Sequence, residues 1–244
     1  MDTPRLNSLA GTEAWHGKIR HARMLVDQAI ESARRDGSAA DYLAMEALSK
    51  APTVTPHRTR ADATDALKLS KDPEIRGKAA LAMAMAGDAA FARNIEAELE
   101  QDYPLSTQVQ EYWLPTIRAA LALQAKDPDR AIELLKKTSD IELAQPCLCS
   151  AYIRGKAYLM LGDGKAAAAE FQKYIDHYGL VGDFTWGALA RLQLARSYEL
   201  EAANDPAARE RARTAYQNFL TLWKDADPDI PIYKQAKAEY AKLQ

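Results

Sequence analysis

The sequence has no long apolar run, and neither sign of charge is in large excess. The longest apolar runs fall well short of the roughly 18 residues expected of a membrane-spanning helix. Residues 1–10 lack the apolar segment of a secretory signal. Lys and Arg number 32 against 34 Asp and Glu, so no strong net field attracts nucleic acid or an anionic membrane. We therefore expect no nucleic-acid partner, no direct membrane insertion and, by default, a cytoplasmic location.

Cysteine is scarce, with two residues in the whole chain. Cys147 and Cys149 are only two positions apart, which is too close for ordinary disulfide geometry. Two cysteines are also too few for a zinc site of their own. We expect both to be helix residues, one exposed and one buried, and redox sensing is the alternative that stays open.

Catalytic and metal-binding motifs are missing. The histidines, His16, His21, His57 and His177, show neither the paired spacing of a zinc protease nor a third ligand nearby. No Gly-x-Ser-x-Gly elbow or Gly-rich nucleotide loop is present. We therefore expect no catalytic residue, no metal and no cofactor. An enzyme of unrecognised type, which would need a deep pocket with perturbed carboxylates, is the minor alternative.

The residues that are present favour helix. Hydrophobic residues make up 48% of the chain, and about a fifth of all residues are Ala, while Val, Ile and Thr are few. Apolar positions recur with a helical period, as in Ala22, Leu25, Val26 and Ala29, and no segment alternates with period two. The sequence therefore predicts an all-α fold.

Turn residues recur at a fixed interval. From Gly17 to Gly87 is 70 residues and from Asp127 to Gly162 is 35, with further breakers between them every 15 to 20 residues. This spacing predicts stacked helix-turn-helix pairs, about thirteen helices in all. The predicted units are residues 6–36, 38–70, 73–103, 105–139, 146–178 and 184–225, followed by a capping helix over 229–243.

Helix starts and ends are also marked. In Asp72-Pro73, Asp127-Pro128 and Asp205-Pro206, the Asp is expected to cap free N–H groups while Pro takes the first helical position. At Gly87-Asp88 and Gly162-Asp163, Gly is expected to end one helix in the left-handed conformation and Asp to begin the next.

The aromatic and small residues of the later units follow a family pattern. Tyr152 to Tyr158 is followed by Ala167 and Phe171, Ala195 pairs with Tyr198, and Ala212 pairs with Tyr216. These residues resemble tetratricopeptide repeats, whereas the earlier units keep the spacing but not the aromatics. The resemblance implies a single α-solenoid over residues 1–244, a right-handed superhelical stack whose first helices line a concave groove.

One pentapeptide occurs twice, at Ile75–Ala79 and at Ile153–Ala157. The two copies lie at different distances from the next turn glycine, because Gly77 precedes Gly87 by ten residues and Gly155 precedes Gly162 by seven. The turn spacing therefore predicts that the two copies are out of register by three residues.

A closer resemblance covers most of the chain. It is carried by the stretches Thr12–Gly17, Tyr112–Ala120, Ala169–Lys173 and Phe219–Asp227, which look like the C-terminal repeat region of bacterial serine/threonine kinase-like and transcription-regulator-like signalling proteins. The sequence has no His-Arg-Asp and no Asp-Phe-Gly, so kinase activity is not implied. The resemblance implies a sensing or docking region, a fragment of a longer chain, and an extracytoplasmic location if that chain is membrane-linked.

A partner is expected in the groove, on first-helix residues that avoid the apolar stripe. Lys156 and Arg196 occupy equivalent places in neighbouring units and are predicted to hold a carboxylate of a peptide, with Tyr152 and Trp113 supplying aromatic surface. The alternative is that both cations pair with acidic neighbours such as Glu199. The predicted groove residues are Trp113, Thr116, Tyr152, Lys156, Leu192, Arg196 and Glu199.

Two other tryptophans are expected to be structural. Trp223 is predicted to be a core residue whose N–H finds a partner, and Trp15 is predicted to seal the N-terminal end. The leading functional hypothesis is a protein-interaction module that binds a protein or peptide. A self-associating structural subunit, in which a second copy covers the N-terminal end to give a homodimer, is the alternative.

Overall fold

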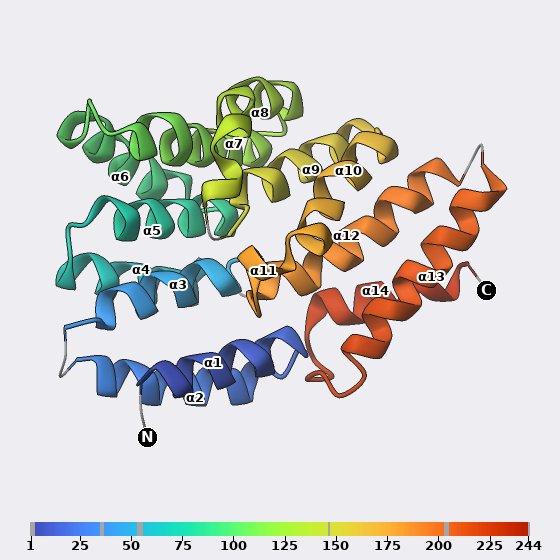
Figure 1. Cartoon of the computed structure of the whole chain (residues 1–244), viewed down its shortest axis with the longest axis horizontal. Coiled ribbons are helices and arrows are strands. Elements are labelled where there is room, and N and C mark those ends of the chain that lie inside the picture. The colour runs from blue at the N-terminus through green and yellow to red at the C-terminus, as the bar shows by residue number, and fades with distance from the viewer. Residues whose placement is uncertain (1–2, 35–36, 53–55, 146, 203–204, 244) are drawn as a thin grey trace. The chain divides into compact units, whose positions relative to one another are not determined.

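The computed structural model describes residues 3–34, 37–52, 56–145, 147–202 and 205–243 (Figure 1). Across these ranges the chain forms fourteen α-helices with short π and 3₁₀ segments, and no strand. The predicted all-α class is confirmed. The helix count exceeds thirteen because a single turn, α11 (Tyr178–Val181), lies between two of the predicted units. None of the helices in these ranges has the length and apolar character needed to cross a bilayer.

The chain divides into two compact units, each made of two segments. Unit 1 comprises Met1–Ala10 and Arg23–Glu142, and unit 2 comprises Gly11–Ala22 and Leu143–Gln244. Helices α1 (Thr3–Trp15) and α2 (Ile19–Ala33) therefore contribute residues to both units, and the turn that joins them belongs to unit 2.

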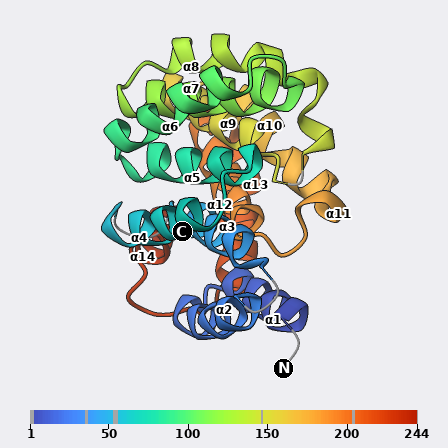
Figure 2. The same ribbon diagram turned by 90° about the vertical axis from the view of Figure 1, so that its left-hand side faces the viewer.

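Unit 1 is built from consecutive helices packed in pairs. Helix α3 packs on α4, α5 on α6 and α7 on α8, and α5 also packs on α3 and α7, between which it lies in Figure 2. Small residues fill much of the core near α2 and α3, including Ala33, Ala39 and Ala44, so the helices approach closely. Besides the parts of α1 and α2, its elements are α3 (Ala39–Lys50), α4 (Pro56–Leu69), α5 (Pro73–Ala86), α6 (Ala89–Asp102), a π-helix (Gln108–Trp113), α7 (Leu114–Gln124), α8 (Pro128–Leu135) and 3₁₀ turns at Lys136–Asp140 and Glu142–Ala144, the last of which continues into unit 2.

Unit 2 repeats this pairing. Helix α9 packs on α10, α10 on α12, α12 on α13 and α13 on α14. Its elements, besides α11 and the α1–α2 turn, are α9 (Cys149–Leu161), α10 (Gly164–Asp176), α12 (Thr185–Glu201), α13 (Pro206–Leu222) and α14 (Pro231–Ala241).

The predicted helix caps are confirmed. Each Asp accepts a hydrogen bond from an N–H group in the first turn of its helix, which satisfies a donor that has no partner within the helix. Gly87 and Gly162 end their helices with φ of 93° and 77°, a conformation that side chains other than that of Gly rarely adopt. The capping residues are Asp72, Asp88, Asp127, Asp163 and Asp205.

The prediction for the cysteines is wrong about the disulfide and about Cys147, although Cys149 is a buried helix residue as expected. Cys147 and Cys149 form a disulfide, and both are buried. Leu148 between them has φ 46° and ψ 32°, so the chain turns in the left-handed region and brings the two Cα atoms to 5.1 Å. That separation lies within the normal range for a disulfide. The Tyr174 hydroxyl, 2.8 Å from the carbonyl oxygens of Cys147 and Leu148, holds this turn against α10.

The double variant Cys147→Ala/Cys149→Ala is expected to lose roughly 1–2 kcal/mol of unfolding free energy, because a three-residue ring restricts the unfolded chain only modestly. Urea unfolding followed by circular dichroism measures this loss. The control is a thiol count on the wild-type protein in denaturant, which should show free thiols only after reduction by a dithiol. Two thiols that react without reduction would contradict the disulfide.

The turn between α1 and α2 is bonded to the C-terminal helices of unit 2. The Trp223 indole N–H donates to the Trp15 carbonyl at 2.9 Å, and the Asp227 N–H donates to the Gly17 carbonyl at 3.1 Å. Trp223 is fully buried, so its predicted role is confirmed. Trp15 is buried as well, beside Gly187, where a Cβ would lie 2.6 Å from the indole ring. It therefore joins the turn to α12 and does not seal an end as predicted.

Candidate functional site

The predicted groove residues are divided between the two units. Trp113 and Thr116 lie in unit 1 and are buried, so neither offers its side chain to a partner. The indole of Trp113 fills the space left by Gly77, where a Cβ would lie 2.4 Å from the ring. The Thr116 hydroxyl donates to the Tyr112 carbonyl of the preceding π-helix at 2.6 Å. The prediction that Trp113 provides aromatic surface is therefore wrong.

Tyr152 and Leu192 are buried too, within unit 2. The Tyr152 ring packs against Phe171 and Trp186, at centroid distances of 5.5 and 4.9 Å. Its hydroxyl accepts a hydrogen bond from the Gln193 amide at 3.5 Å. Burial raises the pKa of Tyr152 to about 12, so its hydroxyl stays neutral. Tyr152 is a core residue, and its predicted surface role is also wrong.

Arg196 is half-buried and has an acidic partner. Its guanidinium donates through Nε to Glu239 Oε2 at 3.0 Å and through Nη2 to Glu239 Oε1 at 2.9 Å. Burial opposes the charge, but the hydrogen bonds that Arg196 donates to Glu239 outweigh it and raise the pKa of Arg196. The alternative of pairing with an acidic neighbour therefore describes Arg196, although the acid is Glu239 of α14 instead of Glu199.

Glu199 binds a hydroxyl instead. The Tyr216 hydroxyl donates to Glu199 Oε2 at 2.6 Å and lies 3.2 Å from Glu239 Oε2. Burial and the hydrogen bond to Glu199 raise the pKa of Tyr216. Tyr216 thus ties Glu199 of α12 to Glu239 of α14, and the pair of carboxylates is fixed beside Arg196.

Lys156 is partly exposed and has no carboxylate within ion-pair distance among the described residues. Burial, together with the nearby charge of Arg196, lowers the pKa of the Lys156 ammonium. The structure therefore brings Lys156 and Arg196 close enough to interact, as predicted, but only Arg196 is neutralised. A cation in this position gains from any anion that approaches it.

The repeated pentapeptide supplies an internal comparison. Its arginines have equivalent surroundings despite the difference in turn spacing, since each is buried and binds an acid on the following helix. Arg76 donates to Glu98 and Asp102 of α6 at 2.6 and 2.7 Å, and Arg154 donates to Glu170 of α10 at 2.8 Å. The glycines of the two copies have different neighbours, because Gly77 packs on Trp113 and Gly155 packs on Phe171 of α10.

The lysines of the two copies differ in their partners. Lys78 binds Asp41 at 2.7 Å and Glu74 at 2.8 Å. Burial would lower the pKa of Lys78, but these two carboxylates outweigh it and raise the pKa. Glu74 precedes Lys78 by four residues, and the position four residues before Lys156 holds Tyr152. Lys156 therefore lacks a carboxylate that its counterpart has.

Stability measurements at different pH values should separate the two lysines. In the folded state Lys156 holds its proton less tightly than in the unfolded chain, so between its lowered pKa and the ordinary value of 10.5 the unfolded chain binds more protons. The contribution of Lys156 to the free energy of unfolding therefore rises with pH in that window. Relative to Lys156→Met, the wild-type protein should become more stable between neutral pH and 10.5, as measured by urea unfolding.

The matched control is Lys78→Met, for which the opposite trend is expected. Because the pKa of Lys78 is raised, its stabilisation is fully present below the ordinary lysine pKa and is lost as the pH rises through the raised value. At neutral pH the substitution should cost about 1–2 kcal/mol, since both carboxylate partners are partly solvated. Identical pH trends for the two variants would refute the difference assigned to the lysines.

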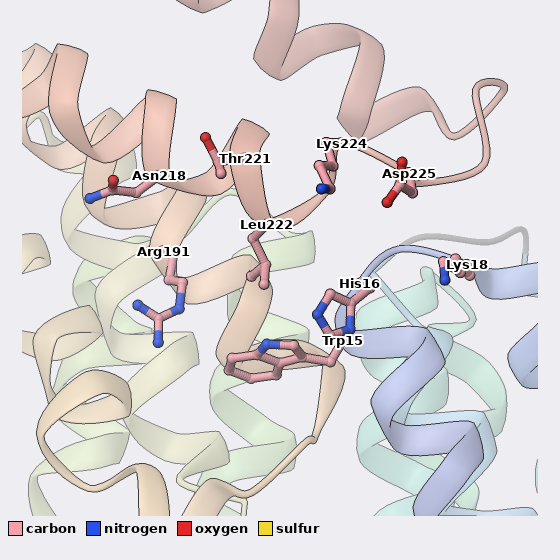
Figure 3. A pocket seen from close by; sticks show the side chains of 9 residues that line it. All are labelled: Trp15, His16, Lys18, Arg191, Asn218, Thr221, Leu222, Lys224 and Asp225. Atoms are coloured by element: carbon pink, nitrogen blue, oxygen red, sulfur yellow. The ribbon is translucent and has the colours of Figure 1, made fainter.

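A second feature was not predicted from the sequence. Unit 2 contains a hollow of about 440 Å³ next to the α1–α2 turn, with a cationic lining (Figure 3). The only hint in the sequence is the Trp15-His16-Gly17-Lys18 turn, because the other lining residues come from far along the chain. They are Arg191, Asn218, Thr221, Leu222, Lys224 and Asp225.

Comparisons with known proteins do not assign the chain to a family. No family model matches the sequence, and no curated protein is significantly similar to it. Within the ranges that the structure describes, His, Cys, Asp and Glu form no group of three that could hold a metal ion. The distinctive chemical groups are therefore cations, Lys156 beside Arg196 and those of the hollow.

Proposed function

We propose that the chain is a non-catalytic protein-interaction module made of tetratricopeptide-like repeats, a scaffold or sensor region of a bacterial signalling protein. The consecutive pairing of helices within each unit supports this proposal, as does the aromatic pattern of the later units. In this proposal the pairs coil into a right-handed superhelix, and α9 and α12 face its concave groove. A protein or peptide partner binds there.

The observation that carries the proposal is the missing counter-charge of Lys156. Its counterpart Lys78 has two carboxylates, and Lys156 has none among the described residues. A carboxylate of the partner would supply the missing charge and would reverse the unfavourable effect of burial on the ammonium. Arg196, which lies beside it, is already paired with Glu239. We infer that the partner presents an Asp or Glu side chain or its C-terminal carboxylate to Lys156.

The buried disulfide bears on where this module works. Disulfides persist in oxidising compartments and are rare in the reducing cytoplasm. We propose an extracytoplasmic location, in place of the default expectation of a cytoplasmic one. This placement also agrees with the resemblance to membrane-linked signalling proteins.

A peptide-binding experiment tests the proposed function. Fluorescently labelled octapeptides with a free C-terminal carboxylate, with the carboxylate amidated, or with Asp replaced by Asn would be titrated against the wild-type protein. We expect the peptides that keep the required carboxylate, either the C-terminal one or that of Asp, to bind the wild-type protein. Lys156→Met should weaken that binding about tenfold, the usual value of one charge-assisted hydrogen bond. Lys165→Met, which removes an exposed lysine of α10, is the control and should leave binding unchanged.

Two outcomes would favour other functions. Binding that is equally strong to Lys156→Met would remove the carboxylate anchor from the proposal. A dimer that persists on dilution in light scattering, with no peptide bound, would favour the self-associating structural subunit instead.

A further inference from the structure

The hollow of unit 2 carries an inference beyond the proposed function. It lies among the α1–α2 turn, α12, α13 and the turn after α13, and Figure 3 shows Arg191 and Leu222 next to the Trp15 ring. Its volume of about 440 Å³ falls in the range of pockets that bind small molecules. None of the residues predicted for the groove lines it.

Arg191 is the central charged group of this hollow. Its guanidinium lies over the Trp15 ring, 5.6 Å from the ring centroid. Trp15 is itself fixed, since its carbonyl binds the Trp223 indole and its ring packs on Gly187. In the described part of the chain no carboxylate is within ion-pair distance of Arg191. A planar guanidinium held on an aromatic ring with its N–H edges unpaired is suited to a carboxylate or a phosphate.

The remaining polar groups extend the chemistry of the hollow. Lys224 adds a second cation, and Lys18 adds a third, although its ammonium lies 3.5 Å from Glu13. Asn218 and Thr221 provide an amide and a hydroxyl, and Asp225 provides a carboxylate. Amide, hydroxyl and carboxylate groups together bind the hydroxyl groups of a ligand, because each ligand hydroxyl both donates and accepts.

Two side chains supply an apolar surface. Trp15 forms one wall together with Leu222 of α13, as Figure 3 shows. An aromatic ring beside an aliphatic side chain suits the C–H face of a small ring, whose polar groups would point to the opposite walls. The hollow thus combines an anion site, hydroxyl partners and a short apolar wall.

We propose that this hollow binds a small hydroxylated organic anion, a sugar acid or a sugar phosphate. The acidic group binds Arg191 with support from Lys224, and the hydroxyl groups bind Asn218, Thr221 and Asp225. The ligand touches the α1–α2 turn as well as α12 and α13, so its binding stabilises unit 2 by a free energy that grows with the logarithm of its concentration. A module that holds both a protein partner and such an anion would act as a sensor.

Isothermal titration calorimetry with four probes tests this site. Gluconate and glucose 6-phosphate represent the two sources of the anionic group, glucose tests the hydroxyl groups alone, and inorganic phosphate tests the charge alone. Saturable binding is expected for at least one of the two hydroxylated anions, with glucose and phosphate each at least tenfold weaker. The better of the two anions identifies the acidic group. Equal affinity for inorganic phosphate, or no saturable binding of either hydroxylated anion, would overturn the proposal.

Matched variants locate the binding. Arg191→Gln should weaken it about tenfold, whereas Arg191→Lys, which keeps the charge but loses the paired donors, should have an intermediate effect. The control is Arg211→Gln, because Arg211 also lies over an aromatic ring of unit 2, 5.1 Å from the Tyr198 centroid, but pairs with Glu201 outside the hollow. Equal losses for Arg191→Gln and Arg211→Gln would overturn the assignment, and circular dichroism would verify that each variant is folded.

Discussion

Trp223→Ala is expected to lower the free energy of unfolding of unit 2 by about 3–5 kcal/mol. The indole is fully buried against Phe219 and Tyr233, at centroid distances of 4.9 and 6.0 Å. A Cβ on Gly17 would lie 2.8 Å from the indole, so the turn glycine makes room for it. The substitution would leave a cavity that neighbouring helices fill only in part. It would also leave the Trp15 carbonyl without its donor.

Differential scanning calorimetry measures this loss, which should lower the midpoint of thermal unfolding by roughly 10 °C. Trp223→Phe is the informative control, since it keeps most of the apolar volume and removes the indole donor. It should cost about 1–3 kcal/mol, the penalty for a buried carbonyl that loses its hydrogen bond. A midpoint unchanged by Trp223→Ala would show that the α1–α2 turn is not bonded to the C-terminal helices as described.

The second large effect is expected from Glu170→Gln, which should cost about 3 kcal/mol. Arg154 and Glu170 have side chains only 7% and 13% exposed, and their charged atoms are 2.8 Å apart. Lys173 also contacts Glu170, at 2.9 Å. The amide would remove the buried negative charge that both cations contact in the helix pair α9–α10. Urea unfolding at neutral pH measures the loss.

The first copy of the pentapeptide provides the matched control, Glu98→Gln. Arg76 keeps a second acid, Asp102, at 2.7 Å, and the side chains of Glu98 and Asp102 are 53% and 51% exposed. Solvated charges of this kind contribute little, so Glu98→Gln should cost less than about 1 kcal/mol. Similar losses for Glu98→Gln and Glu170→Gln would mean that burial does not set the strength of these ion pairs.

The local features of the fold could be predicted from the sequence. An Asp before the first turn, or a Gly after the last, acts through atoms within four residues, and the caps at Asp72, Asp163 and Gly162 are confirmed for that reason. The helical class follows from composition for the same reason, since propensity is a property of each residue.

The exposure of the groove residues could not be predicted in this way. Helices such as α9 and α12 are covered on several sides, so buried residues run along all their faces and no single apolar stripe separates core from surface. Tyr152 and Leu192 are expected in the groove because they lie outside the apolar stripe, but the surrounding helices bury both. Lys156 and Arg196 are only partly exposed, and burial acts against the charge of both.

The disulfide and the hollow depend on geometry that pattern and spacing do not reveal. Cys147 and Cys149 meet because Leu148 adopts a left-handed conformation, which Leu seldom does. The hollow combines Trp15 with Arg191 and Lys224, which are far apart in the sequence. No local signal in either segment points to the other.

Unit 2 is made of two segments that are far apart in the sequence, and this has a consequence for its synthesis. The Trp15 carbonyl and the Trp223 indole that binds it are 208 residues apart. At the usual rate of translation, the N-terminal turn would wait ~10–40 s on the ribosome for this partner. Until Tyr178, Gly187 and Arg191 have been made, the Trp15 side chain lacks the residues that cover it, and a chaperone that binds exposed aromatic residues has time to engage it. Nascent chains stalled before residue 178 are the species on which to look for that engagement.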